Sequence, residues 1–142
     1  MDEETRRAAA GHVRYERAML RATAGYLVAA REDDPRFHHY AQLESFLMHV
    51  RNLWDFLDSN GDRPDDVLAK LYNDDGSWRA SSVPPEVKLI NKHVAHITTK
   101  RLVDLAWNVP GLEAVTLQGF AEFLETVTPG RRPWFDWIEL QA

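Results

Sequence analysis

Three histidines, His49, His93 and His96, have side chains suited to metal ligation or proton transfer. His93 and His96 are three residues apart, so both imidazoles point to roughly the same side of a helix. One hypothesis is a metal-binding helical-bundle enzyme that uses all three. The alternative is that they make hydrogen bonds within the core. Neither Glu-x-x-His nor His-Glu-x-x-His occurs in the sequence, so we expect no metal and no cofactor.

A second group of polar residues lies on the segment that carries His49. Arg51 and Asp55 are four residues apart, the spacing of an ion pair along a helix. The polar residue types on this one segment predict a network of Glu44, His49, Arg51, Asn52 and Asp55. Buried charges and amides persist in proteins only when they are paired, so this network either specifies helix packing or belongs to a catalytic site.

Residues 40–58 also carry the clearest apolar periodicity of the chain. Apolar residues recur at alternating steps of three and four, which predicts an amphipathic helix with its stripe in a core. The stripe contains Tyr40, Leu43, Leu47, Val50, Trp54 and Leu57. This helix is the expected centre of the fold.

The remaining elements follow from the same periodicity and from helix start and stop signals. The prediction is an all-α fold, a single domain over 1–142, built as an up-and-down bundle. Four main helices are expected, at 3–31, 35–58, 84–107 and 112–127, with a short helix at 64–72 and a Trp-rich C-terminal tail. Asp34 is the expected cap of the second helix, and Asn60 and Gly61 are expected to end it in left-handed conformations.

Composition restricts the classes of function. The net charge of −5 gives no general attraction to nucleic acid or anionic lipid, and zero cysteines exclude thiolate chemistry and disulfides. No apolar run approaches the ~20 residues of a membrane span, and the N-terminus lacks the order of a secretory signal. We therefore expect a cytoplasmic protein without a membrane segment.

Two phrases, LESFLMHVRNLWDFLD and INKHVAHITTKR, occur in this order on either side of a loop that contains Asp65, Asp66 and Trp78. Their layout resembles uncharacterised small bacterial helical proteins and is similar to the HEPN class (higher eukaryote and prokaryote nucleotide-binding). The resemblance covers residues 40 to 105. It implies an all-α domain that forms a homodimer, and apolar faces on the 84–107 helix and on the tail also favour a homodimer.

HEPN domains that act as metal-independent ribonucleases carry Arg, four to six residues, then His on a late helix. Here Asn91 stands five residues before His96, so the arginine of that pattern is absent. If the chemistry persists, the resemblance implies that His96 is the general acid or base and that Asn91 positions phosphate. Lys92 and Arg101 would then bind the phosphate charge.

The preferred hypothesis from sequence is a HEPN-like interaction module that is dimeric and not an enzyme. Its expected partners are a second copy, another protein or RNA. The first alternative is a metal-independent ribonuclease that uses His96, and the second is the metal-binding enzyme of His49, His93 and His96.

Overall fold

The computed structural model describes residues 1–61, 63–95 and 106–137 of the chain. Two long helices come first, α1 (Glu3–Ala29) and α2 (Arg36–Asp58), and a third long helix, α4 (Val109–Thr126), comes late in the chain. Shorter elements are the 3₁₀ helices η1 (Ala69–Tyr72) and η4 (Arg132–Phe135), the α-helix α3 (Pro85–Ile90), and the π-helix η2 (Asn91–Ala95). The described residues contain no strand, and the predicted all-α bundle is confirmed.

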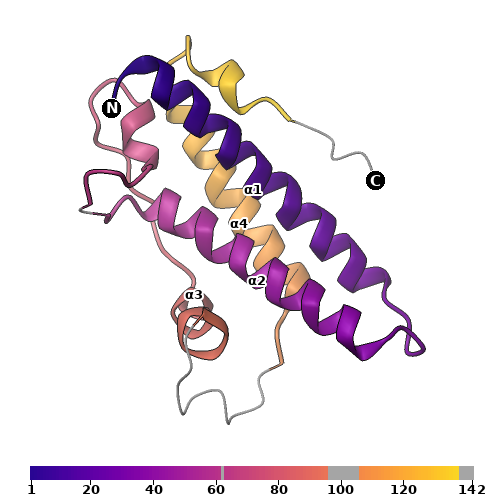
Figure 1. The fold of residues 1–142 in the computed structure, drawn as a ribbon. Coiled ribbons are helices and arrows are strands. Elements are labelled where there is room, and N and C mark those ends of the chain that lie inside the picture. The colour runs from indigo at the N-terminus through magenta and orange to yellow at the C-terminus, as the bar shows by residue number, and fades with distance from the viewer. Residues whose placement is uncertain (62, 96–105, 138–142) are drawn as a thin grey trace.

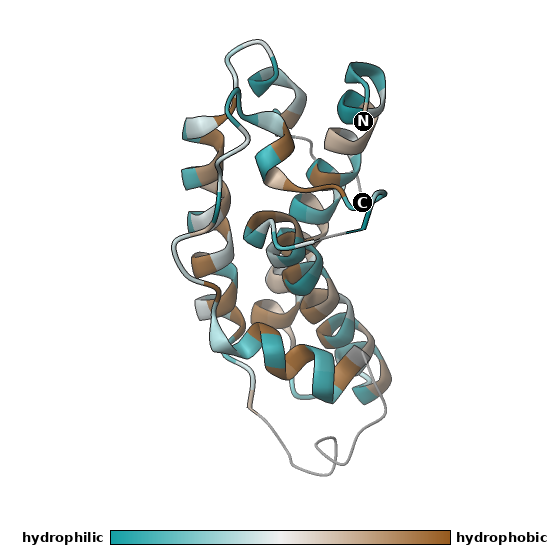
Figure 2. Cartoon of the chain, turned by 90° about the vertical axis from the view of Figure 1, so that its left-hand side faces the viewer, coloured by the Kyte–Doolittle hydropathy of each residue, from teal (hydrophilic) through white to brown (hydrophobic). Residues whose placement is uncertain are grey.

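The three long helices form the body of the molecule. α1 and α2 lie side by side as an antiparallel hairpin, and α4 lies behind them and contacts both (Figure 1). α3 lies beside α2 and is seen nearly end-on in the same view, so it does not run alongside the hairpin. Figure 2 shows brown hydrophobic stripes beside teal hydrophilic ones along the helices, as amphipathic packing requires.

The core lies between the hairpin and α4. Trp54 of α2 is buried, and its indole N–H donates to Thr116 Oγ1 of α4 at 2.9 Å. Gly119 lies against the same indole, where an added Cβ would come within 2.9 Å of Trp54 Cη2. The two helices therefore approach closely because α4 has a glycine opposite the largest core side chain of α2.

A cluster of five aromatic rings joins four separate elements at one end of the bundle. Centroid separations of 5.0 Å for Tyr72–Phe135 and 5.1 Å for Phe56–Phe123 are typical of edge-to-face packing. The aromatic cluster contains Phe56 of α2, Tyr72 of η1, Phe120 and Phe123 of α4, and Phe135 of η4. It holds the loops and the tail against the long helices.

The predicted Trp-rich tail packs on its own domain through this cluster. Phe135 is buried in it, and Trp137 lies beneath the guanidinium groups of Arg17 and Arg21, at 4.7 and 5.3 Å from its ring centroid. Cation–π attraction from α1 therefore holds the tail beside the first helix.

Three predicted helix boundaries are wrong. Residues 64–68 are not helical, and the short helix is reduced to the single 3₁₀ turn of η1. The predicted 84–107 helix changes from α to π at Asn91, and Ala106 and Trp107 lie outside any helix; residues 96–105 are outside the described part of the chain. Pro110 does not precede α4 but lies in its first turn, where a missing N–H costs nothing.

The ends of α2 also differ from the prediction. Asp34 does not cap α2; its carboxylate instead accepts from the backbone N–H of Arg31 at 2.8 Å. The left-handed residue after α2 is Ser59, with φ of 55°, and not Asn60 or Gly61. Ser59 is buried, and its Oγ accepts from Lys70 N at 3.1 Å, so a long-range hydrogen bond fixes the turn.

One residue of the predicted core stripe is on the surface. Tyr40 is 59% exposed, whereas Leu47, Val50, Trp54 and Leu57 are buried as predicted. Tyr40 lies in the first turns of α2, near the connection to α1, where fewer elements cover the helix.

Candidate functional site

The predicted polar network on α2 divides into two parts. His49 and Asn52 turn toward α1, where both meet the carboxylate of Glu16: His49 Nδ1 lies 2.6 Å from Glu16 Oε2 and Asn52 Nδ2 donates to it at 3.2 Å. The ring of Tyr15 packs edge-on against the imidazole at 6.0 Å. Because one carboxylate from α1 holds two side chains of α2, this polar cluster fixes the register of the hairpin.

Arg51 and Asp55 form the second part. Their ion pair, at 3.5 Å, runs along the outside of α2, with 28% of the arginine and 59% of the aspartate side chain exposed. Pairs of this kind contribute about 0.3–0.5 kcal/mol. Burial raises the pKa of Asp55, with further upward effects from Asp58 and Asp66 and an opposing one from Arg51. Glu44 is exposed and lies apart from both clusters.

A polar hollow of about 500 Å³ adjoins this ion pair. Acidic and basic side chains both line it, and two of its carboxylates accept local hydrogen bonds: Asp66 from the backbone N–H of Arg63 at 3.1 Å, and Asp58 from the Asn60 amide at 2.6 Å. Its lining is Arg51, Asn52, Asp55, Phe56, Asp58, Asn60, Gly61, Arg63, Asp66, Val67 and Leu68. Among the described residues its lining contains no histidine, serine or threonine, and its ionisable groups are carboxylates and guanidinium groups.

The predicted ribonuclease residues are only partly in the described chain. Asn91 begins the π-helix η2 and is half-buried, and its Oδ1 is buried without a hydrogen-bond partner. Lys92 is exposed, and His93 packs edge-on against Trp107 at 6.5 Å. His96 and Arg101 lie outside the described residues.

The metal hypothesis concerns His49, His93 and His96. The Nδ1 of His49 is engaged by Glu16, which leaves only Nε2 for another ligand. Within residues 1–61, 63–95 and 106–137, no group of three or more histidine, aspartate or glutamate side chains is arranged to hold a metal ion.

A largely apolar hollow lies at the opposite end of the hairpin from the aromatic cluster. It has a volume of about 600 Å³ and lies where the end of α1, the start of α2 and the start of α4 meet. We name it the hairpin groove; it is lined by Leu27, Val28, His39, Tyr40, Leu43, Ala106, Trp107, Val109 and Pro110. Val28 and Tyr40 are 64% and 59% exposed, and Phe37 beside them is 77% exposed.

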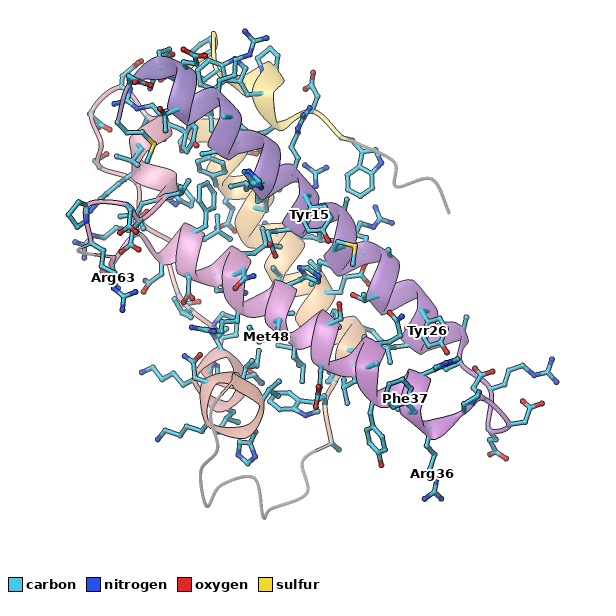
Figure 3. The ribbon with its side chains drawn as sticks, in the orientation of Figure 1. Tyr15, Tyr26, Arg36, Phe37, Met48 and Arg63 are labelled. Atoms are coloured by element: carbon cyan, nitrogen blue, oxygen red, sulfur yellow. The ribbon has the colours of Figure 1, made fainter. Side chains whose placement is uncertain are left out.

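The rim of the hairpin groove carries charges of both signs. A second hollow shares Leu27, His39 and Tyr40 with the groove and is otherwise lined by residues of the α1–α2 connection, Ala30, Arg31, Glu32, Asp34 and Arg36. Figure 3 shows Arg36 and Phe37 at this end of the hairpin, with Tyr26 on the facing part of α1 and Tyr15 farther along that helix. Apolar surface and mixed charge therefore lie next to each other.

Sequence reasoning missed two of these features. Glu16 was not singled out, because nothing in its local sequence shows which residue it meets 33 positions later. The hairpin groove was missed because Tyr40 and Leu43 were assigned to the buried stripe. A signal was present in the sequence, since Val28, Phe37 and Tyr40 flank the connection between the two helices.

Comparison with protein-family models, with curated proteins and with solved structures gives no match for this chain. Within the described residues, no helix is both long enough and apolar enough to cross a membrane.

Proposed function

We propose that this chain is a HEPN-like interaction module that acts without catalysis and pairs with a second copy of itself through the hairpin groove. The observation that carries this proposal is the exposure of Val28 and Tyr40, which line an apolar hollow, together with that of Phe37, one turn before Tyr40 on α2. Large aromatic and aliphatic side chains left in water at one place are typical of protein interfaces.

The charges on the rim favour a second copy of this chain as the partner that binds in the hairpin groove. The rim is lined by Arg31 and Arg36 and by Glu32 and Asp34. The side chains of Arg31 and its ion-pair partner Asp33 are 81% and 78% exposed. A surface that carries both signs next to an apolar centre is complementary to itself when a two-fold axis relates two copies. A partner of single charge would meet repulsion from half of this rim.

The polar features of the surface support binding in place of catalysis. The Glu16–His49–Asn52 cluster lies between two helices, and only its Asn52 lines one of the hollows described above, the polar hollow. In the polar hollow, Asp58 and Asp66 accept hydrogen bonds from neighbouring loop residues. These groups satisfy one another, as structural polar groups do.

The test is the molar mass of the purified chain as a function of concentration, measured by sedimentation equilibrium. The wild type is expected to be dimeric, and Tyr40→Arg is expected to be monomeric, because it places a charge in the centre of the apolar groove. The matched control is Tyr15→Arg, the same substitution at a tyrosine that is 45% exposed in the middle of α1. Circular dichroism checks that all three proteins fold alike.

Two outcomes contradict the proposal. A monomeric wild type removes the homodimer, and a Tyr40→Arg variant that remains dimeric places the interface elsewhere. If Tyr15→Arg alone dissociates the dimer, the interface is on the middle of the hairpin.

A separate assay tests the absence of catalysis. A mixed RNA pool is incubated in excess chelator with the wild type and with His96→Ala at matched folding. We expect no cleavage by either protein. Cleavage by the wild type that is lost in the variant would replace the proposal with the ribonuclease hypothesis, because that reaction uses the substrate's own 2′-hydroxyl and needs no metal.

A further inference from the structure

A further hollow lies in a loop far from the hairpin groove. It has a volume of about 520 Å³ and lies between the segment after η1 and the end of α4. We name it the loop hollow; it is lined by Asn73, Asp74, Asp75, Ser77, Trp78, Arg79 and Thr126. Its lining includes two carboxylates, an amide and two hydroxyl groups, and no histidine lines it.

Asn73 contributes to the loop hollow a buried amide oxygen that accepts no hydrogen bond. Its residue exposure is 9%, and its Nδ2 donates to both the backbone oxygen and the Oγ1 of Thr126 at 2.8 Å. These two bonds fix which way the amide faces. Its Oδ1 is buried and has no hydrogen-bond partner, which is rare for a buried amide oxygen.

Two carboxylates stand beside this oxygen in the chain. Asp75 accepts from the N–H of Ser77 at 3.0 Å and from its Oγ at 2.7 Å, and these hydrogen bonds lower the pKa of Asp75. Asp74 accepts from Thr128 Oγ1 at 2.8 Å. Gly76, with φ of 64°, makes the turn that places these residues together. The carboxylates are held in place and retain free lone pairs.

The end of α4 adds negative potential to the same hollow. Thr126 is the last residue of this 18-residue helix, and the last turn contains no basic residue. The carbonyl end of a helix is equivalent to roughly half a negative charge. Two carboxylates and a helix terminus therefore outweigh Arg79, the guanidinium that lines the hollow.

We propose that the loop hollow binds a calcium ion, with Asn73 Oδ1 and the carboxylates of Asp74 and Asp75 as protein ligands. Calcium takes six to eight oxygen ligands from carboxylates, amides and water in irregular geometry, which suits a loop with one amide and two carboxylates. Zinc and other transition metals prefer nitrogen or sulfur ligands, which this lining lacks. A bound cation would give Asn73 Oδ1 its missing partner and tie the loop to α4.

Trp78 makes binding directly observable. It lines the hollow, and its ring is near enough to transfer excitation to a bound terbium ion, which occupies calcium sites. The full chain, freed of divalent ions with chelator and then of the chelator, is titrated with terbium while tryptophan is excited. We expect sensitised terbium emission that excess calcium chloride displaces, and a rise in Tm on adding calcium chloride.

The variant is Asp74→Asn with Asp75→Asn, which keeps side-chain size at two exposed positions and is expected to fold. It should lose the sensitised emission and the rise in Tm. The matched control, Asp33→Asn in the α1–α2 connection, should keep both. The proposal is overturned if calcium leaves the wild-type Tm unchanged, if the double variant responds like the wild type, or if magnesium stabilises the chain and calcium does not.

Discussion

Raising the pH should destabilise this protein through a single buried phenol. Tyr72 has no exposed surface, its ring lies in the aromatic cluster, and its OH donates to the backbone oxygen of Arg6 at 2.9 Å. Burial raises the pKa of Tyr72 from 10.0 to about 12, against smaller opposing effects of Arg6 and Arg131. The charged phenolate is disfavoured because the site offers it little solvation.

The sign of the pH dependence follows from the proton count. Between pH 10 and 12 the folded chain keeps the phenolic proton of Tyr72, whereas the unfolded chain releases it. The folded state therefore binds more protons than the unfolded state in this window, and the free energy of unfolding falls as the pH rises through it. One pKa unit corresponds to about 1.4 kcal/mol, so the loss is about 1 kcal/mol at pH 11 and approaches about 3 kcal/mol above pH 12.

The assay combines urea unfolding at pH 7, 10 and 11 with phenolate absorbance. Comparison with Tyr72→Phe assigns the signal, because phenolate absorbance that the wild type gains and the variant does not gain belongs to Tyr72. Tyr72→Phe costs about 0.5–1.5 kcal/mol at pH 7, because it removes one hydrogen bond. From pH 7 to pH 11 the free energy of unfolding should fall less in Tyr72→Phe than in the wild type. An equal loss of stability from pH 7 to 11 in the wild type and in Tyr72→Phe would refute the reasoning.

Three further substitutions, two of them paired with a control variant, test the packing of the long helices. Thr116→Val should destabilise the chain by about 1–3 kcal/mol, because the buried indole N–H of Trp54 loses its acceptor, and Thr116→Ser should retain most of the stability; urea unfolding measures both. Gly119→Ala should lower the Tm, with a cost of about 1–3 kcal/mol, because the new Cβ meets Trp54 Cη2 at 2.9 Å; an unchanged Tm would mean that α4 moves freely. Glu16→Leu should cost about 1.5–3 kcal/mol in chemical denaturation, since it leaves His49 and Asn52 without their shared partner, whereas the exposed Glu44→Leu should change stability little.

Local sequence was enough to predict the long helices. α1 and α2 match the expected ranges to within about two residues, because spacing of three and four on a proline-free segment has few other solutions. The same reasoning was wrong at helix ends. The turn after α2 depends on the hydrogen bond from Lys70 N–H to Ser59 Oγ. The segment predicted as one continuous helix changes from α to π at Asn91. Local propensity does not contain those long-range contacts.

The candidate sites show the same division. The residues of α2 that carry polar chemistry were predicted from their types, but Glu16, which organises His49 and Asn52, was found only in the folded chain. Asn73 was not among the predicted site residues, and its Oδ1 is left unpaired because Thr126 of α4 holds the amide nitrogen.

Sequence alone therefore determined the class of the fold and which faces of the helices are apolar, since both follow from the period of the α-helix. Tertiary structure decided which part of each apolar face is covered. Tyr40 belongs to the same stripe as Trp54, yet Trp54 is buried beneath α4 while Tyr40 stays 59% exposed at the hairpin groove. Periodicity repeats along a helix, but burial depends on where the neighbouring elements end.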